Sequence, residues 1–174
     1  QLSDPKGSKG LVERDVIRVV TPGTVVETGL LESTRNNYLA AVIIEGQRAG
    51  IAYVDITTGE FAAIQLEAAR AGAELERLSP SEILIPGEGT GLSLPVEPTK
   101  LAPHWFELET AREALLDHFE VSTLDGYGCA DRPLAVRAAG AIIRYLAETQ
   151  KGSLARLPGL STYSVDAFMT LDAQ

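Results

Sequence analysis

Aspartate is the residue type in this sequence whose placement could support chemistry with metal ions. Asp55 lies on a predicted strand at residues 51–56, whereas Asp125 and Asp131 lie in predicted loops. Two-metal nucleases hold their ions about 4 Å apart between converging carboxylates. The predicted first strand, residues 38–44, contains no acidic residue, so these three aspartates define no two-metal site. Aspartates that form turns or face solvent are the simpler interpretation.

A glycine-rich segment at residues 87–91 (GEGTG) follows another predicted strand, the position at which phosphate-binding loops occur. The segment lacks the Lys-Ser or Lys-Thr pair of such loops, and prolines interrupt the residues after it. No helix N-terminus is therefore available to bind a phosphate. We interpret residues 87–103 as a surface loop.

The single cysteine, Cys129, would be a nucleophile only beside a histidine and an orienting carboxylate. The two histidines, His104 and His118, are placed by no motif, and with one cysteine they do not complete the usual zinc ligand sets. One cysteine also excludes an internal disulfide. The sequence therefore predicts no catalytic residue, no cofactor-binding residue and no metal ligand.

Two arginines are the candidate contacts for a partner. Arg137 and Arg144 are seven residues apart on one face of a helix predicted over residues 134–150. This spacing suits an acidic partner, although arginines on a helix surface are more often simply solvated. We carry both residues forward as a weak candidate interaction site.

The elements that position these residues are organised around residues 36–66. The apolar run at 38–44 predicts a central strand covered on both faces. A connection at 45–50 leads to the strand at 51–56, and Thr-Thr-Gly-Glu at 57–60 predicts a tight turn before a third strand at 61–66. Three short strands joined in this way predict an antiparallel meander.

Helices and a further strand follow the meander. Strong helix formers predict a helix after Leu66 that ends at Ser79-Pro80, and a strand at 82–85 after that helical crossover. Thr110 and Glu113 have the spacing of a capping box, which predicts a helix over residues 111–119. Other strands are expected at residues 15–20 and 163–171. The fold class is therefore α/β, with an antiparallel three-strand meander, parallel strands and flanking helices, as at the start of a ribonuclease H-like fold.

The amino-acid composition argues against two kinds of partner, a nucleic acid bound by this chain alone and a membrane. The formal net charge of −9 disfavours binding of this chain alone to a phosphate backbone, because that affinity comes from Lys and Arg. No apolar run approaches the roughly 20 residues that span a bilayer, so we expect a cytoplasmic protein and no membrane partner. The chain begins at Gln1 without a start Met, and we expect it to be a piece of a longer protein.

Seven segments, in order, resemble the MutS family of bacterial DNA mismatch-recognition proteins. They are RDVIRVVTPGT (14–24), NNYLAAVI (36–43), YVDITTGEF (53–61), LERLSPSEILIP (75–86), LDGYG (124–128), AAGAIIRYLAETQK (138–151) and FMTLDAQ (168–174). Together they cover most of the chain, and residues 87–103 match least.

The resemblance implies three domains. Residues 1–24 would end the mismatch-binding domain, residues 25–150 would form the connector domain with a ribonuclease H-like fold, and residues 151–174 would begin the core or lever domain. The connector would be non-catalytic and would relay signals between the DNA-binding and ATPase ends. In the intact family member, a homodimer binds mismatched DNA, uses ATP and Mg²⁺, and recruits MutL. Two alternatives stay open, namely a metal-dependent ribonuclease H-like nuclease and a protein-interaction domain outside mismatch repair.

Overall fold

The structure, a computed structural model, describes residues 37–164. Two predicted elements, the strand at 15–20 and most of the strand at 163–171, lie outside the described residues. The strands are β1 (Leu39–Glu45), β2 (Arg48–Asp55), β3 (Glu60–Glu67), β4 (Glu82–Pro86), β5 (Thr99–Leu101) and β6 (Ser161–Thr162). The α-helices are α1 (Ala68–Leu78), α2 (Leu108–Phe119) and α3 (Pro133–Thr149). Short 3₁₀ helices are η4 (Pro103–Phe106), η5 (Asp125–Tyr127) and η6 (Lys151–Arg156).

Within the described residues the strands form one sheet in the order β5-β4-β1-β2-β3-β6. The meander β1-β2-β3 is antiparallel, whereas β4 is parallel to β1 and β5 is parallel to β4. This arrangement confirms the predicted α/β class and its mixed sheet. At the other edge β6 lies parallel to β3, an addition that the sequence did not predict.

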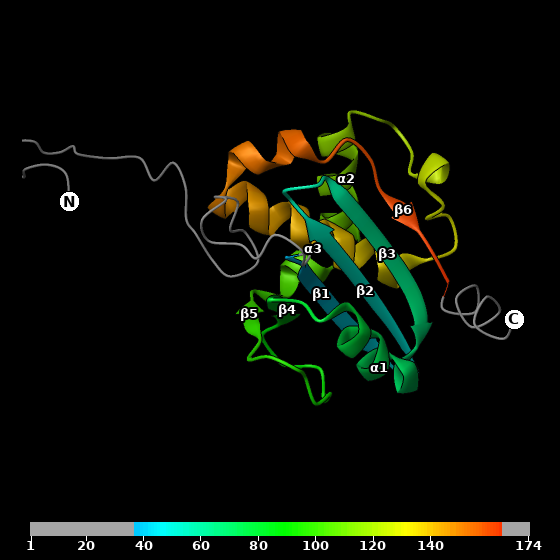
Figure 1. The fold of residues 1–174 in the computed structure, drawn as a ribbon. Helices are drawn as coiled ribbons and strands as arrows, with labels where there is room; N and C mark the ends of the chain where they lie inside the picture. Colours follow the sequence, from blue (N-terminus) through cyan, green and yellow to red (C-terminus); the bar gives the residue numbers. More distant parts are fainter. Residues whose placement is uncertain (1–36, 165–174) are drawn as a thin grey trace, which may run out of the picture.

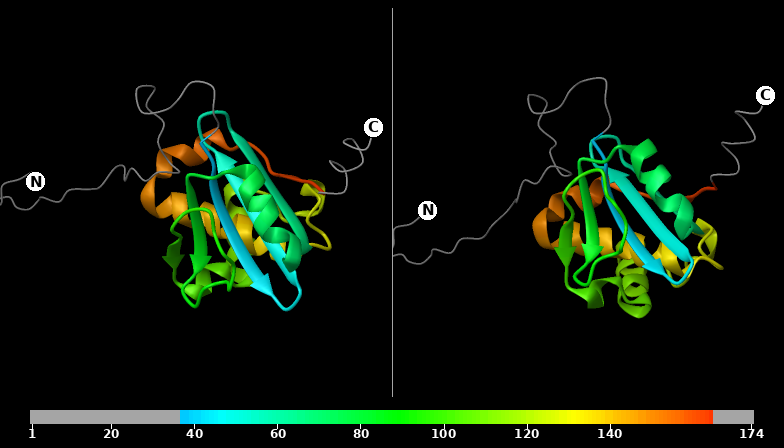
Figure 2. Two further views of the ribbon diagram at one scale, coloured as in Figure 1. Left: turned by 60° about the horizontal axis from the view of Figure 1, so that its bottom comes forward. Right: turned by 90° about the horizontal axis from the view of Figure 1, so that it is seen from below.

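Helices cover both faces of the sheet, with α1 on one face and α2 and α3 on the other (Figures 1 and 2). Side chains alternate between faces along a strand, so β1 contributes to two separate cores. Leu39, Ala41 and Ile43 pack with the α2 and α3 side chains. Ala40 and Val42 pack with α1. The uninterrupted apolar run of β1 is thus explained by burial on both faces.

The turns of the meander are tighter than predicted at one end. Glu45 pairs directly with Arg48, so the connection is a two-residue turn with Gly46 at φ +62°, and β2 begins three residues earlier than expected. This turn requires a positive φ, which glycine adopts without strain. At the other turn, Gly59 donates its N–H to the carbonyl oxygen of Asp55 at 2.8 Å.

Helix α2 begins earlier than the capping box indicated. Thr110 lies inside the first turn, and the N-cap residue is Glu107, which makes no side-chain capping bond. The reason is the preceding turn η4, because its Phe106 is buried and fixes the path of the chain just before the helix. The predicted capping role of Thr110 is therefore wrong, whereas the predicted end at Phe119 is confirmed.

Two glycines allow close packing around α3. A Cβ atom on Gly50 of β2 would lie 2.1 Å from the carbonyl oxygen of Leu134, and one on Gly140 would lie 2.4 Å from Ala111 of α2. Only glycine fits at such distances, so α3 lies directly against both the sheet and α2. At Gly140 the element in close contact with α3 is α2.

Residues 151–164 continue on the same sheet. Leu157 and Leu160 are buried in the core on the α3 side, and β6 pairs with β3. The core on the α3 side therefore extends past residue 150 to Leu160. Among residues 37–164, no helix has both the length and the apolar character needed to cross a bilayer.

Candidate functional site

The two arginines proposed as partner contacts both bind η4. Arg137 donates from Nε to the carbonyl oxygen of Phe106 at 2.7 Å and forms an ion pair with Glu45, the last residue of β1. Arg144 lies over the ring of Trp105, with 5.2 Å between its guanidinium carbon and the ring centroid. The structure thus brings the two arginines to one short turn. Any contact with a partner would use the parts of these half-buried side chains that remain accessible.

Asp55, the aspartate on β2, has hydrogen-bond partners that give it a structural role. Its side chain is buried and accepts hydrogen bonds from the backbone N–H of Thr57 at 3.0 Å, from the Thr57 hydroxyl and from the backbone N–H of Asn37 at 3.4 Å. These contacts stabilise the turn after β2. Asp125 begins the 3₁₀ turn η5 and Asp131 is exposed in a loop.

Over the described part of the chain, no three His, Cys, Asp or Glu side chains are gathered as a metal-binding set. The acidic residue of β1, Glu45, stands at the end of the strand, is exposed and forms an ion pair with Arg137. Converging carboxylates are what a two-metal nuclease requires. The geometry therefore does not support the nuclease alternative.

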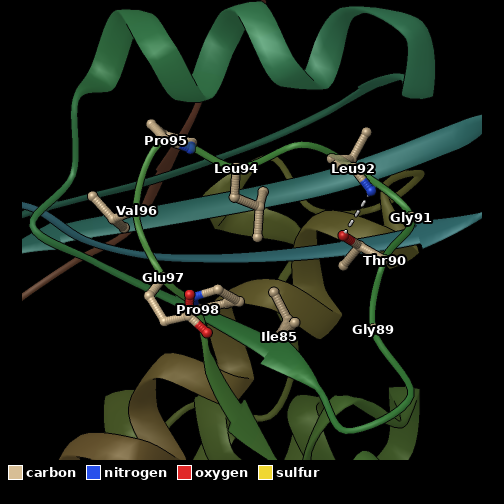
Figure 3. Close-up of a pocket in the computed structure, with 10 residues that line it drawn as sticks. All are labelled: Ile85, Gly89, Thr90, Gly91, Leu92, Leu94, Pro95, Val96, Glu97 and Pro98. Carbon is tan, nitrogen blue, oxygen red and sulfur yellow. Dashed lines mark hydrogen bonds between the residues drawn. The ribbon is translucent and has the colours of Figure 1, made fainter.

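The glycine-rich segment lines a hollow. After β4, Gly89 donates its N–H to the carbonyl oxygen of Pro86 at 2.8 Å, and no helix follows. Residues 89–98 instead run in an irregular path that ends at β5, which the sequence did not predict. With Ile85 they line an open hollow of about 470 Å³ (Figure 3). Leu92, Leu94 and Val96 are half-buried against the core on the α1 side, which explains why this loop stays on the sheet.

Cys129 has the environment of a structural thiol. It is buried, and burial raises its pKa, with a smaller opposing effect from Arg132. A nucleophilic cysteine needs the opposite, a pKa low enough for thiolate to form. His118 is engaged elsewhere, because its Nε2 atom is 2.8 Å from the carbonyl oxygen of Leu157.

A cluster of tyrosines that sequence reasoning missed lies on the α1 face. Tyr38, just before β1, and Tyr53 of β2 have ring centroids 4.7 Å apart, and Tyr53 and Tyr163 have centroids 6.0 Å apart. The hydroxyls of Tyr38 and Tyr53 both donate to the carboxylate of Glu60, at 3.0 and 3.2 Å. Alternation along the strands places the first two rings on one face, but no local pattern connects Tyr163 to them.

The third tyrosine contacts an ion pair on α1 whose carboxylate, Glu74, is buried. Tyr163 donates from its hydroxyl to Oε2 of Glu74 at 2.6 Å, and Arg77 donates to both oxygens of the same carboxylate. Glu74 is buried, so these donors offset the cost of removing its charge from water. Burial is the first cause, and the bond to Glu74 the second, of a Tyr163 pKa far above its usual range.

Comparisons with known proteins agree on one family. The family model of MutS domain II matches residues 37–158. The DNA mismatch repair protein MutS of Dehalococcoides mccartyi (strain ATCC BAA-2266 / KCTC 15142 / 195) is 45% identical over 177 residues, which cover 99% of this chain and 20% of that protein. The MutS proteins of Thermosynechococcus vestitus and Roseiflexus castenholzii are 42% and 39% identical, over 100% and 97% of this chain and 22% and 20% of their own. The chain therefore spans about a fifth of the length of these relatives.

Proposed function

This chain belongs to the MutS family of DNA mismatch repair proteins, of which residues 37–158 are domain II, and from that premise we propose that it acts as a non-catalytic connector within a longer protein. The observation that carries the proposal is the domain II match to a part of the chain in which Asp55 and His118 make structural hydrogen bonds and Cys129 is buried. A sheet covered by helices on both faces is a stable body for joining other domains. Fold alone does not warrant a reaction.

The connector relays conformational signals between the end that binds mismatched DNA and the end that binds ATP. Both activities belong to the longer protein, which acts as a homodimer in the cytoplasm. ATP and Mg²⁺ would bind outside this chain, because its glycine-rich segment has neither the Lys-Ser or Lys-Thr pair nor a following helix. We also expect the boundary with the core or lever domain to lie after residue 160, since Leu157 and Leu160 belong to the core of this sheet.

The connector also contributes to recruitment of a MutL-type protein. Its exposed surface includes the turn η4, where Arg144 and Trp105 meet at the surface. A planar aromatic ring with a guanidinium over it is a composition enriched at protein interfaces. Arg144→Glu in the full-length protein tests this surface, with Arg112→Glu on the exposed side of α2 as the control for reversing one charge. Equal MutL crosslinking in both variants would remove Arg144 as a contact.

Two experiments test the connector proposal. The isolated residues 37–164 are expected to hydrolyse no ATP and to bind heteroduplex DNA weakly at physiological salt. In the full-length protein, replacing these residues by a flexible linker of similar reach is expected to leave mismatch binding in place and to abolish its response to ATP. Release from heteroduplex DNA on ATP addition is the measurement. Normal release from the linker variant, or ATP hydrolysis by residues 37–164, would overturn the proposal.

A further inference from the structure

The three tyrosines join the two ends of the described domain. Tyr38 lies where the chain enters the sheet at β1, and Tyr163 lies where it leaves the sheet after β6. Both rings contact the same ring, that of Tyr53 on β2, with centroid distances of 4.7 and 6.0 Å. Two segments from opposite ends of the chain therefore share one buried aromatic neighbour.

The backbone attaches residues 161–163, where the chain leaves the sheet (the leaving segment), through a short strand only. Strand β6 is two residues long, and beyond it Tyr163 donates its N–H to the carbonyl oxygen of Ala63 at 3.1 Å. The Tyr163 side chain adds the bond to Glu74, whose ion pair with Arg77 belongs to α1. Side-chain contacts of Tyr163 thus hold the end of the domain to both the sheet and α1.

In the entering segment, Tyr38 and the start of β1, Tyr38 shares a hydrogen-bond acceptor with Tyr53 as well as a ring contact. The hydroxyls of both residues donate to the carboxylate of Glu60 at the start of β3. Tyr53 is buried, whereas Tyr38 and Tyr163 are half-buried on either side of it. A displacement of either outer ring therefore changes the packing of the central one, because buried aromatic side chains have little free volume around them.

We propose that Tyr53 couples the entering segment at Tyr38 to the leaving segment at Tyr163, so that loosening one end of the domain loosens the other. The use of this coupling in signalling rests on the proposed connector function. An aromatic pair contributes about 0.5–1.5 kcal/mol beyond burial, or roughly two- to twelvefold in an equilibrium constant. With two such contacts in series, we expect a transmitted effect near the lower end, about two- to threefold.

Amide hydrogen exchange in the full-length protein tests the coupling at two reporters. The N–H of Ser81 binds the carbonyl oxygen of Tyr38 at 2.9 Å and reports on the entering segment, and the N–H of residue 163 reports on the leaving segment. Tyr163→Leu is expected to speed exchange at Ser81 about two- to threefold, and Tyr38→Leu to speed exchange at residue 163 by a similar factor. Reciprocity of this kind is required of any equilibrium coupling.

Variants at the central ring distinguish the aromatic route from general destabilisation. In a Tyr53→Leu background both transmitted effects are expected to disappear, whereas Tyr53→Phe keeps the ring and should keep them. Trp105→Leu is the matched control, since Trp105 is a half-buried aromatic residue of η4 that packs against the core on the other side of the sheet. It is expected to leave both reporters within error of the wild type.

Each outcome decides the inference. Unchanged Ser81 exchange in Tyr163→Leu, equal acceleration in Trp105→Leu, or persistence of the effect without the Tyr53 ring would overturn it. These readouts need neither DNA nor ATP, so the coupling fails or stands independently of the connector proposal. If ATP-dependent release did not require residues 37–164, the connector proposal would be overturned, and the exchange result would still stand.

Discussion

The hydroxyl of Tyr145 on α3 donates a hydrogen bond of 2.7 Å to Oε2 of Glu82 on β4, and both residues are buried. Thr99 at the start of β5 donates to the same oxygen at 3.0 Å. A buried carboxylate is stable only where donors replace its lost water. Through Glu82, helix α3 is therefore fixed to the two strands at one edge of the sheet.

Tyr145→Phe is expected to destabilise the domain by about 1–3 kcal/mol, because it removes a donor from a buried carboxylate without changing the packing of the ring. Urea unfolding of residues 37–164 measures this change. Tyr127→Phe is the control, since within the described residues the Tyr127 hydroxyl donates no hydrogen bond. Equal stability of the two variants would show that the bond to Glu82 contributes little.

Gly140→Ala and Gly72→Ala form a matched pair of helix substitutions with opposite expected signs. A Cβ on Gly140 would lie 2.4 Å from Ala111, whereas one on Gly72 of α1 has nothing within 4 Å. Gly72→Ala should stabilise the domain by roughly 0.5–1 kcal/mol through helix propensity. Gly140→Ala should destabilise it, because α2 and α3 must separate to admit the methyl group. Thermal unfolding of both variants distinguishes the two effects, and stabilisation by Gly140→Ala would contradict the close helix contact.

The tyrosine cluster predicts a loss of stability at alkaline pH. Burial, and then the hydrogen bond to Glu60, raises the pKa of Tyr38 from 10.0 to about 12. Burial, and then the charge of Glu60, raises the pKa of Tyr53 well above its usual value. Above pH 10 the unfolded tyrosines lose protons that the native ones keep, so the native state binds more protons and stability falls as pH rises.

Tyr38→Phe is expected to weaken this pH dependence between pH 10 and about 12, the interval between the pKa of Tyr38 in the unfolded chain and its pKa in the native domain. Its stability at pH 8 is the internal reference, because Tyr38 is neutral there in both states. Urea midpoints across the interval provide the measurement. A slope as steep as that of the wild type would show that Tyr38 titrates normally in the native domain.

The meander was predictable because its signals are local. The apolar run of β1, the Thr-Thr-Gly-Glu turn and the Pro after α1 each act within a few residues. Strands β5 and β6 were not predictable in the same way, since three and two residues carry little periodicity and pair only because neighbouring strands are present. In helix α2 a local signal is overridden. The capping box predicted a helix that starts after Thr110, but Phe106 is buried just before the helix and α2 begins at Leu108.

The contacts of the candidate site were likewise only partly predictable from local patterns in the sequence. Periodicity placed Arg137 and Arg144 on one helix face, but it did not show that both would bind the turn η4. The contact of Tyr163 with Tyr53 depends on the whole order of the sheet, which no spacing in the sequence encodes. Whether either group meets a partner in the full-length protein stays a prediction.

The contact between Arg144 and Trp105 leads to a prediction that one chromophore can report, because Trp105 is the single tryptophan of the chain. Arg144→Ala should uncover the indole and cost about 0.5–1 kcal/mol, whereas Arg144→Lys keeps the charge and should retain part of the interaction. Acrylamide quenching of tryptophan fluorescence measures the exposure of the ring. Glu148→Ala, at an exposed position of the same helix, controls for loss of a charged side chain. If quenching in Arg144→Ala matches that in Glu148→Ala, the guanidinium does not cover the ring in solution, and Arg144 is then free to meet an acidic partner directly.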